Sequence, residues 1–109
     1  MSKYHSRSIV VDGIMFPSHR EARRYRELKL LERAGEIRDL ELQKKYVLIP
    51  AQKKPSGGTE RACTYTADFV YKDSTGREVV EDAKGMHTQQ YVIRRKMMLW
   101  VHGIEVMEV

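Results

Sequence analysis

Apolar and polar residues alternate along much of the chain in the manner of β-strands. Short apolar runs in Ser8 to Phe16, around the turn dipeptide Asp12-Gly13, predict a small hairpin. Ile37 to Ile49 alternates loosely and predicts one long strand or two. Cys63 to Tyr71 and Arg77 to Lys84 predict a second hairpin, because β-forming residues flank a turn cluster of Asp, Ser, Thr and Gly.

Two segments show the three-to-four-residue period of helices. The first begins at Ser18 with the S-x-x-E pattern of a capping box, runs to about Ala34 and stops at Gly35. The second runs from about Thr88 to His102, and a closing strand follows it. The apolar stripe that predicts the buried face of the first helix consists of Ala22, Tyr25, Leu28 and Leu31.

The order hairpin, helix, strand, hairpin, helix, strand predicts a mixed β-sheet flanked by helices, in the α/β or α+β class. A chain of 109 residues holds one core, so we expect residues 1–109 to form a single domain. Gln52 to Arg61 is rich in Lys, Pro, Ser and Gly, and we expect it to be a mobile, exposed loop.

The charge balance favours an acidic partner. Lys and Arg outnumber Asp and Glu by 20 to 15, which gives a net charge of +5 and favours a polyanion such as nucleic acid. Cys63 is the single cysteine, so there is no internal disulfide, and no Cys/His spacing indicates structural zinc. No apolar run approaches the roughly 18 residues of a membrane span. We therefore expect a cytoplasmic protein with no membrane partner.

The second predicted hairpin brings two carboxylates together. If its turn has five residues, counting inward places Asp68 directly opposite Asp82. Like charges in such a pair repel by roughly 0.2–1 kcal/mol, so the pair needs a cation. Lys84 follows Asp82 by two residues and points to the same face. A register slip of one residue would turn Glu81 inward instead, although the spacing to Lys84 favours Asp82.

Two neighbouring carboxylates suit a hard divalent cation. Mg²⁺ takes oxygen ligands and leaves positions for water and a substrate phosphate, and Mn²⁺ accepts the same ligands. Such an ion polarises a phosphate and makes water more acidic. Lys84 would add positive charge where negative charge builds up during phosphodiester hydrolysis. Whether one or two ions bind is open at this stage.

The residues around this pair resemble a known nuclease signature. Asp68 in Tyr-Thr-Ala-Asp-Phe, followed by Glu81-Asp82-Ala83-Lys84-Gly85, is similar to the motif of PD-(D/E)xK nucleases, with alanine in place of the usual proline. The resemblance implies a restriction-endonuclease-like core, metal ligation by Asp68, Asp82 and Glu21, and a catalytic role for these three and Lys84. The capping box alone also explains a glutamate at position 21.

A closer resemblance concerns the segment Phe16 to Ala22 together with the two motif strands. They are similar to small phage proteins described as Holliday junction resolvase-like. This similarity implies a homodimeric, magnesium-dependent endonuclease that cuts branched DNA in the cytoplasm of a bacterial host. The alternatives are a phage nuclease that acts on flaps, ends or any duplex, a DNA-binding protein without activity, and a nuclease that cleaves RNA.

Basic residues outside the motif are candidates for contacts with phosphates. They lie on the first helix, in the exposed loop and on the final helix, where a solvated helix face is the simpler explanation. The DNA-binding candidates are Arg20, Arg24, Lys53, Lys54, Arg95 and Lys96.

Overall fold

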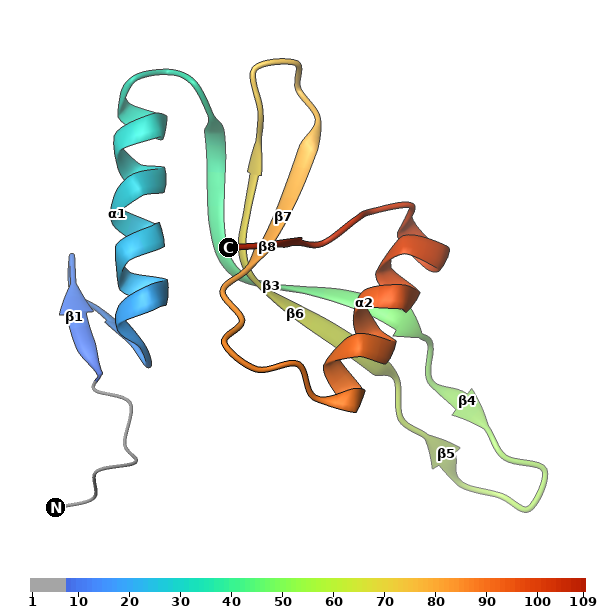
Figure 1. Cartoon of the computed structure of the whole chain (residues 1–109). Coiled ribbons are helices and arrows are strands. Elements are labelled where there is room, and N and C mark those ends of the chain that lie inside the picture. The colour runs from blue at the N-terminus through green and yellow to red at the C-terminus, as the bar shows by residue number, and fades with distance from the viewer. Residues whose placement is uncertain (1–7) are drawn as a thin grey trace, which may run out of the picture.

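The computed structural model describes residues 8–109 and has an α+β fold, which confirms the predicted class. Two helices pack against a four-stranded sheet (Figure 1). No helix within residues 8–109 is long and apolar enough to cross a membrane. The elements are β1 (Ile9–Val11), β2 (Ile14–Phe16), α1 (His19–Arg33), β3 (Arg38–Ile49), β4 (Gln52–Lys53), β5 (Thr59–Glu60), β6 (Cys63–Lys72), β7 (Glu78–Asp82), α2 (Gln89–His102) and β8 (Met107–Glu108). The small β1–β2 hairpin lies beside α1, and the small β4–β5 hairpin projects from the end of β3 and β6.

The predicted first hairpin and first helix are both present. β1 pairs with β2, and α1 begins after Ser18, whose side chain accepts a hydrogen bond from the backbone N–H of Glu21 at 3.2 Å. The helix ends before Gly35, which has φ +80° and so the left-handed conformation that favours glycine. The side chains that α1 buries are those of Ala22, Tyr25 and Leu28, with Leu31 partly buried.

The central sheet has the strand order β3-β6-β7-β8 and is mixed, because β8 runs parallel to β7 while the other pairs are antiparallel. Lys72 pairs with Glu78 across a five-residue turn, which confirms the predicted register. β7 ends at Asp82, two residues earlier than expected. The backbone N–H of Ala83 donates to the side chain of Asp68, at 2.9 Å, so the chain leaves the strand here.

The segment 37–49 forms one strand, β3, which bends sharply together with β6 (Figure 1). Gln43 of β3 has φ +55° and lies opposite Asp68 of β6. Ala67 belongs to the core cluster that contains α2 residues, whereas Phe69 belongs to the cluster that contains α1 residues. A regular strand would direct both side chains to one face. At Gln43 and Asp68, therefore, the side chains that alternate along β3 and β6 change from one face of the sheet to the other.

The segment expected to be a mobile loop is a hydrogen-bonded hairpin, so that prediction was wrong. β4 pairs with β5, and Lys53 lies opposite Thr59. The sequence Lys54-Pro55-Ser56-Gly57 closes a β-turn, in which the backbone N–H of Gly57 donates to the carbonyl of Lys54 at 3.0 Å. The expected exposure is confirmed, because every residue from 49 to 62 is exposed.

Candidate active site

The four residues predicted for catalysis lie together where β7 leads toward α2. Asp68 and Asp82 come from the neighbouring strands β6 and β7, and the Asp68 carboxyl group lies close enough to Asp82 to raise its pKa. Lys84 Nζ lies 3.8 Å from Asp82 Oδ1. Burial raises the pKa of Glu21, the nearby Asp68 raises it further, and Lys84 lowers it, so Glu21 faces the same place from α1. Three separate segments of the chain therefore converge on one site.

Asp82 is a buried acid with one unsatisfied oxygen. Its side chain is only 2% exposed, and its Oδ2 accepts a hydrogen bond of 2.5 Å from the hydroxyl of Tyr65. Its Oδ1 has no hydrogen-bond partner among residues 8–109. Burial raises the pKa of Asp82 to about 7, the contact with Asp68 contributes in the same direction, and the Tyr65 hydrogen bond opposes both. A buried acceptor without a partner is costly, so the site favours an added cation or donor.

Asp68 is held in place from both neighbouring strands. Its Oδ2 accepts from the backbone N–H of Ala83 at 2.9 Å, and its Oδ1 accepts from Gln43 Nε2 at 3.2 Å. The left-handed backbone of Gln43 is uncommon for a residue other than glycine. Sequence reasoning did not identify Gln43, because nothing in the alternation of β3 marks the residue at which the strand bends.

Glu81, the rival of Asp82 for the metal site, points to the other face of β7. Its carboxylate accepts two hydrogen bonds from the guanidinium of Arg24 of α1, at 2.7 and 2.6 Å, and one from the hydroxyl of Tyr71. Arg24 also pairs with Glu27 at 3.1 Å. The guanidinium of Arg24, which the sequence predicts to contact DNA, thus binds α1 to the sheet. This ion pair fixes the helix that carries Glu21.

A shallow pocket of about 280 Å³ opens beside Asp82 and Lys84. Tyr65 and Tyr91 line it, and Lys84 Nζ lies 4.9 Å from the centre of the Tyr91 ring, at cation–π distance. Arg94 also lines the pocket and donates from Nε to the carbonyl of Thr64 at 3.0 Å. Sequence reasoning did not assign these three side chains to the site. The spacing of Tyr91 and Arg94 from Thr88 along α2 was the signal available, since three residues make about one helical turn.

The remaining DNA-binding candidates occupy different places. Arg20 donates from Nη1 to the carbonyl of Lys84 at 2.9 Å, so it lies at the site. Arg95 pairs with Glu108 at 3.0 Å, whereas Lys96 is exposed and has no ion pair within residues 8–109. Lys53 and Lys54 lie on the β4–β5 hairpin, away from the site (Figure 1).

A family model described as "Protein of unknown function (DUF1064)" matches residues 1–104. The chain belongs to this family. No curated protein and no solved structure matches the chain significantly. The description of this family gives no activity.

The site of this DUF1064 protein fits a divalent cation only in part. Within residues 8–109, no group of three or more His, Cys, Asp and Glu side chains is arranged to hold a metal ion. The predicted trio of Glu21, Asp68 and Asp82 is therefore not a ready-made cage. Asp82 Oδ1, which accepts no hydrogen bond, and the neighbouring Asp68 carboxylate nevertheless offer hard oxygen donors, the kind of donor that Mg²⁺ uses when water and substrate complete its shell.

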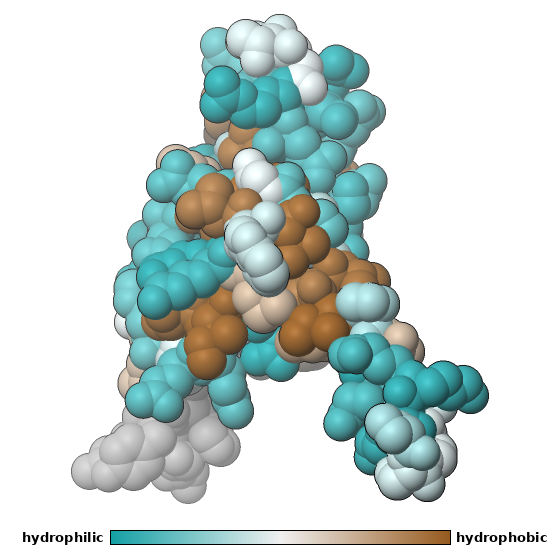
Figure 2. All heavy atoms as spheres, turned by 90° about the vertical axis from the view of Figure 1, so that its right-hand side faces the viewer, coloured by the Kyte–Doolittle hydropathy of each residue, from teal (hydrophilic) through white to brown (hydrophobic). Residues whose placement is uncertain are grey.

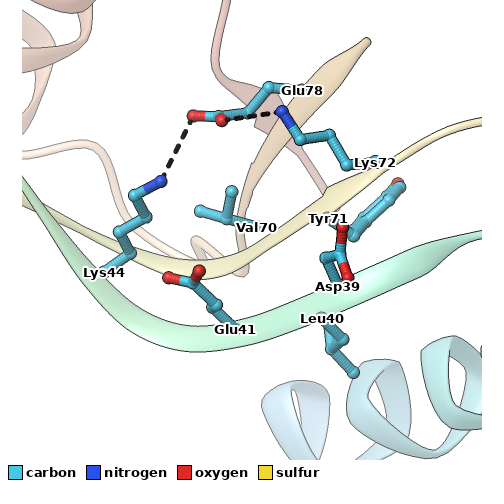
Figure 3. A pocket seen from close by; sticks show the side chains of 8 residues that line it. All are labelled: Asp39, Leu40, Glu41, Lys44, Val70, Tyr71, Lys72 and Glu78. Carbon is cyan, nitrogen blue, oxygen red and sulfur yellow. Dashed lines mark ion pairs between the residues drawn. The ribbon is translucent and has the colours of Figure 1, made fainter. Parts of the chain in front are cut away.

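A second hollow, of about 390 Å³, lies on the bent sheet around Glu78 (Figure 3). Lys44 and Lys72 both pair with Glu78, each at 3.6 Å, and the hydroxyl of Tyr46 donates to the same carboxylate at 2.5 Å. The carboxylate of Glu78 therefore has ion-pair and hydrogen-bond partners, whereas Asp82 Oδ1 accepts no hydrogen bond. We assign no chemistry to this hollow.

Proposed function

We propose that the protein is a metal-dependent endonuclease that hydrolyses phosphodiester bonds in DNA. The observation that supports this most strongly is the convergence of Glu21, Asp68, Asp82 and Lys84 on one site, in which Asp82 keeps a buried, unsatisfied oxygen. A raised pKa beside a specific charge partner is typical of functional sites. The similarity of these residues to the PD-(D/E)xK signature points to the same reaction.

Each residue would have a defined task in this reaction. Asp68 and Asp82 would hold the cation, and Glu21 would complete the site from α1, through water where its carboxylate does not reach. When bound, Mg²⁺ or Mn²⁺ would supply Lewis acidity toward the scissile phosphate. Lys84 would stabilise the negative charge that builds up on the phosphate oxygens in the transition state.

The same side chains would also hold the substrate. Lys84 and Arg94 line the pocket with positive charge, and Arg20 adds a third charge where it donates to the backbone carbonyl of Lys84. Lys96 lies further along α2. Phosphate contacts of this kind position a duplex without reading its sequence. We therefore expect binding that depends strongly on salt and weakly on base sequence.

Two finer points belong to the proposal, namely branched DNA as the substrate and a homodimer as the active form. Support for the dimer comes from α2, where Ile93, Leu99 and Trp100 are exposed, Trp100 by 84%. In Figure 2, apolar surface gathers on the body of the molecule. Exposed apolar residues in such number mark interaction surfaces. Two copies would supply two active sites for the two strands of a junction.

The proposal is tested by incubating the protein with labelled four-way junction, flap and linear duplex DNA and with single-stranded RNA, in Mg²⁺ or in EDTA. We expect paired, Mg²⁺-dependent cuts in the junction that Asp82→Asn abolishes. If every DNA substrate is cut equally, the proposed nuclease activity stands and the proposed preference for branched DNA is rejected. Binding of DNA without any cleavage would overturn the proposed activity.

A further inference from the structure

The β4–β5 hairpin is an arm that stands apart from the body of the protein. Its two strands pair only with each other, and the whole of residues 50–62 is exposed (Figure 1). Backbone hydrogen bonds close its tip, from Gly57 N to Lys54 O at 3.0 Å and from Lys54 N to Gly58 O at 3.2 Å. Gly57 and Gly58 have φ of +100° and +84°, which their turn positions require. The arm is therefore an ordered structure with no core of its own.

The composition of the arm indicates what it contacts. Lys53, Lys54 and Arg61 are exposed and have no ion pair within residues 8–109, and Glu60 is the single acidic residue between positions 50 and 61. The arm has no aromatic residue and no large aliphatic residue beyond Ile49. Protein interfaces and membrane insertion both need such apolar anchors. In Figure 2 the projection at the lower right is hydrophilic, whereas the apolar surface gathers on the middle of the molecule.

The shape of the arm suits a nucleic-acid groove. A two-stranded β-ribbon has the width that the major groove of DNA admits. The small residues Ser56, Gly57 and Gly58 form the tip, so the backbone can approach the floor of a groove closely. Lysine and arginine side chains beside such a ribbon would face the phosphates on either side.

The position of the arm sets its reach from the active site. Lys53 pairs with Thr59. Thr59 precedes Asp68 by nine residues in the sequence. At about 3.3 Å per strand residue, Thr59 lies at most ~30 Å from Asp68. That span corresponds to about nine base pairs of duplex at a rise of 3.4 Å.

We infer that the β4–β5 hairpin is a second DNA contact, which enters a groove of the duplex up to about nine base pairs from the scissile phosphate. The inference rests on the proposed function, because that function identifies DNA as the acidic partner. It adds a separate binding element to the active site and gives the protein a minimum length of DNA for full affinity.

The test measures binding and leaves cleavage out. Asp82→Asn protein in EDTA is titrated with blunt duplexes of 8 and 24 base pairs over a range of salt concentrations. It is compared with the same protein carrying Lys53→Ala, Lys54→Ala and Arg61→Ala in addition. The matched control instead carries Arg23→Ala, Arg26→Ala and Arg33→Ala, which remove the same charge from exposed positions of α1.

We expect the arm variant to bind the 24-base-pair duplex about tenfold or more weakly and to lose about 2–3 from its salt slope, given about 0.9 per phosphate contact. Its affinity for the 8-base-pair duplex should fall by no more than about twofold. The α1 control should keep the gain in affinity with length. An arm variant that keeps this gain would overturn the inference, as would an equal loss in the α1 control.

These outcomes separate the inference from the proposed nuclease activity. If the wild-type protein cuts DNA but the arm variant binds long duplex as tightly as Asp82→Asn alone, the nuclease proposal holds and the inference fails. If binding depends on the arm but no substrate is cut, the inference holds and the nuclease proposal fails.

Discussion

The hydroxyl of Tyr65 donates to Asp82 Oδ2 at 2.5 Å and thereby stabilises the charged form of a buried acid whose other oxygen accepts no hydrogen bond from the described residues. Two opposing effects therefore act on one carboxyl group. Burial and the neighbouring Asp68 favour its protonated form, whereas Tyr65 and Lys84 favour the carboxylate. A carboxylate is the form that a metal ion needs.

Tyr65→Phe should weaken metal binding in a pH-dependent way. Loss of the hydroxyl raises the pKa of Asp82 further, so a smaller fraction is ionised near pH 7. Hydrogen bonds to a charged group contribute roughly 1.5–3 kcal/mol, so Mg²⁺ affinity at pH 7 should fall by about tenfold or more and recover partly at pH 9. Calorimetric titration with Mg²⁺ measures this. Tyr46→Phe, which removes a comparable hydrogen bond to Glu78, serves as control. An equal loss in both variants would contradict the assigned role of Tyr65.

The pKa of Asp82 also predicts how stability depends on pH. The pKa of Asp82 rises from its ordinary value of 3.8 to about 7 on folding. Between these pH values the folded state therefore binds more protons than the unfolded state. Stability in EDTA should therefore fall as pH rises from about 4 to about 7. The raised pKa of Glu21 acts in the same direction. Thermal unfolding from pH 5 to pH 8 should show a falling midpoint that Asp82→Asn flattens, and a midpoint that rises in the wild type would contradict this reading.

The two neighbours Glu81 and Asp82 should respond to amide substitution in opposite ways. Glu81→Gln breaks a buried ion pair with Arg24, which typically costs about 3–5 kcal/mol. Asp82→Asn removes a buried charge that lacks full compensation, so the protein should keep or gain stability while it loses metal binding. Urea unfolding gives both values. Glu27→Gln removes the exposed partner of Arg24 and should cost about 1 kcal/mol or less. Similar stabilities for the Glu81 and Asp82 variants would contradict the structure.

Gln43 should show a trade-off between stability and metal affinity. Gln43→Gly relieves a left-handed backbone, which should stabilise the fold by about 1 kcal/mol, but it removes a hydrogen bond to Asp68. We expect a higher unfolding midpoint together with weaker Mg²⁺ binding. Asp39 is the matched control, since it has φ +59° in the same strand but pairs only with exposed Arg38 at 3.7 Å. Asp39→Gly should gain stability and leave Mg²⁺ binding intact. Weaker Mg²⁺ binding in this control would contradict the role assigned to the hydrogen bond from Gln43 to Asp68.

Local sequence signals predicted much of the fold. The turn residues between β6 and β7 set the register that brings Asp68 and Asp82 together, and Ser18 and Gly35 set the limits of α1. Such features depend on a few adjacent residues, whose turn and capping preferences are strong.

Contacts between distant segments could not be predicted in the same way. The bend at Gln43 depends on packing against two helices, and no glycine marks it in the sequence. Arg24 reads as an exposed basic residue until its partner Glu81, 57 positions away, is placed opposite it. The sequence predicts a loop where the β4–β5 hairpin lies, because the two strands have only two residues each, too few to show an alternation of apolar and polar residues.

The most direct test of the account is the conversion of supercoiled plasmid to nicked or linear DNA by wild-type protein, Asp82→Asn, Lys84→Ala and Glu36→Gln, with Mg²⁺ and with EDTA. Glu36 is an exposed carboxylate outside the site and serves as control. We expect Mg²⁺-dependent cutting by the wild type and Glu36→Gln, and a loss of at least about 100-fold in the other two variants. Asp82→Asn removes a proposed metal ligand, and Lys84→Ala removes a group that would stabilise transition-state charge. Cutting that survives Asp82→Asn, or a wild-type protein that leaves the plasmid intact with Mg²⁺ and with Mn²⁺, would contradict the account.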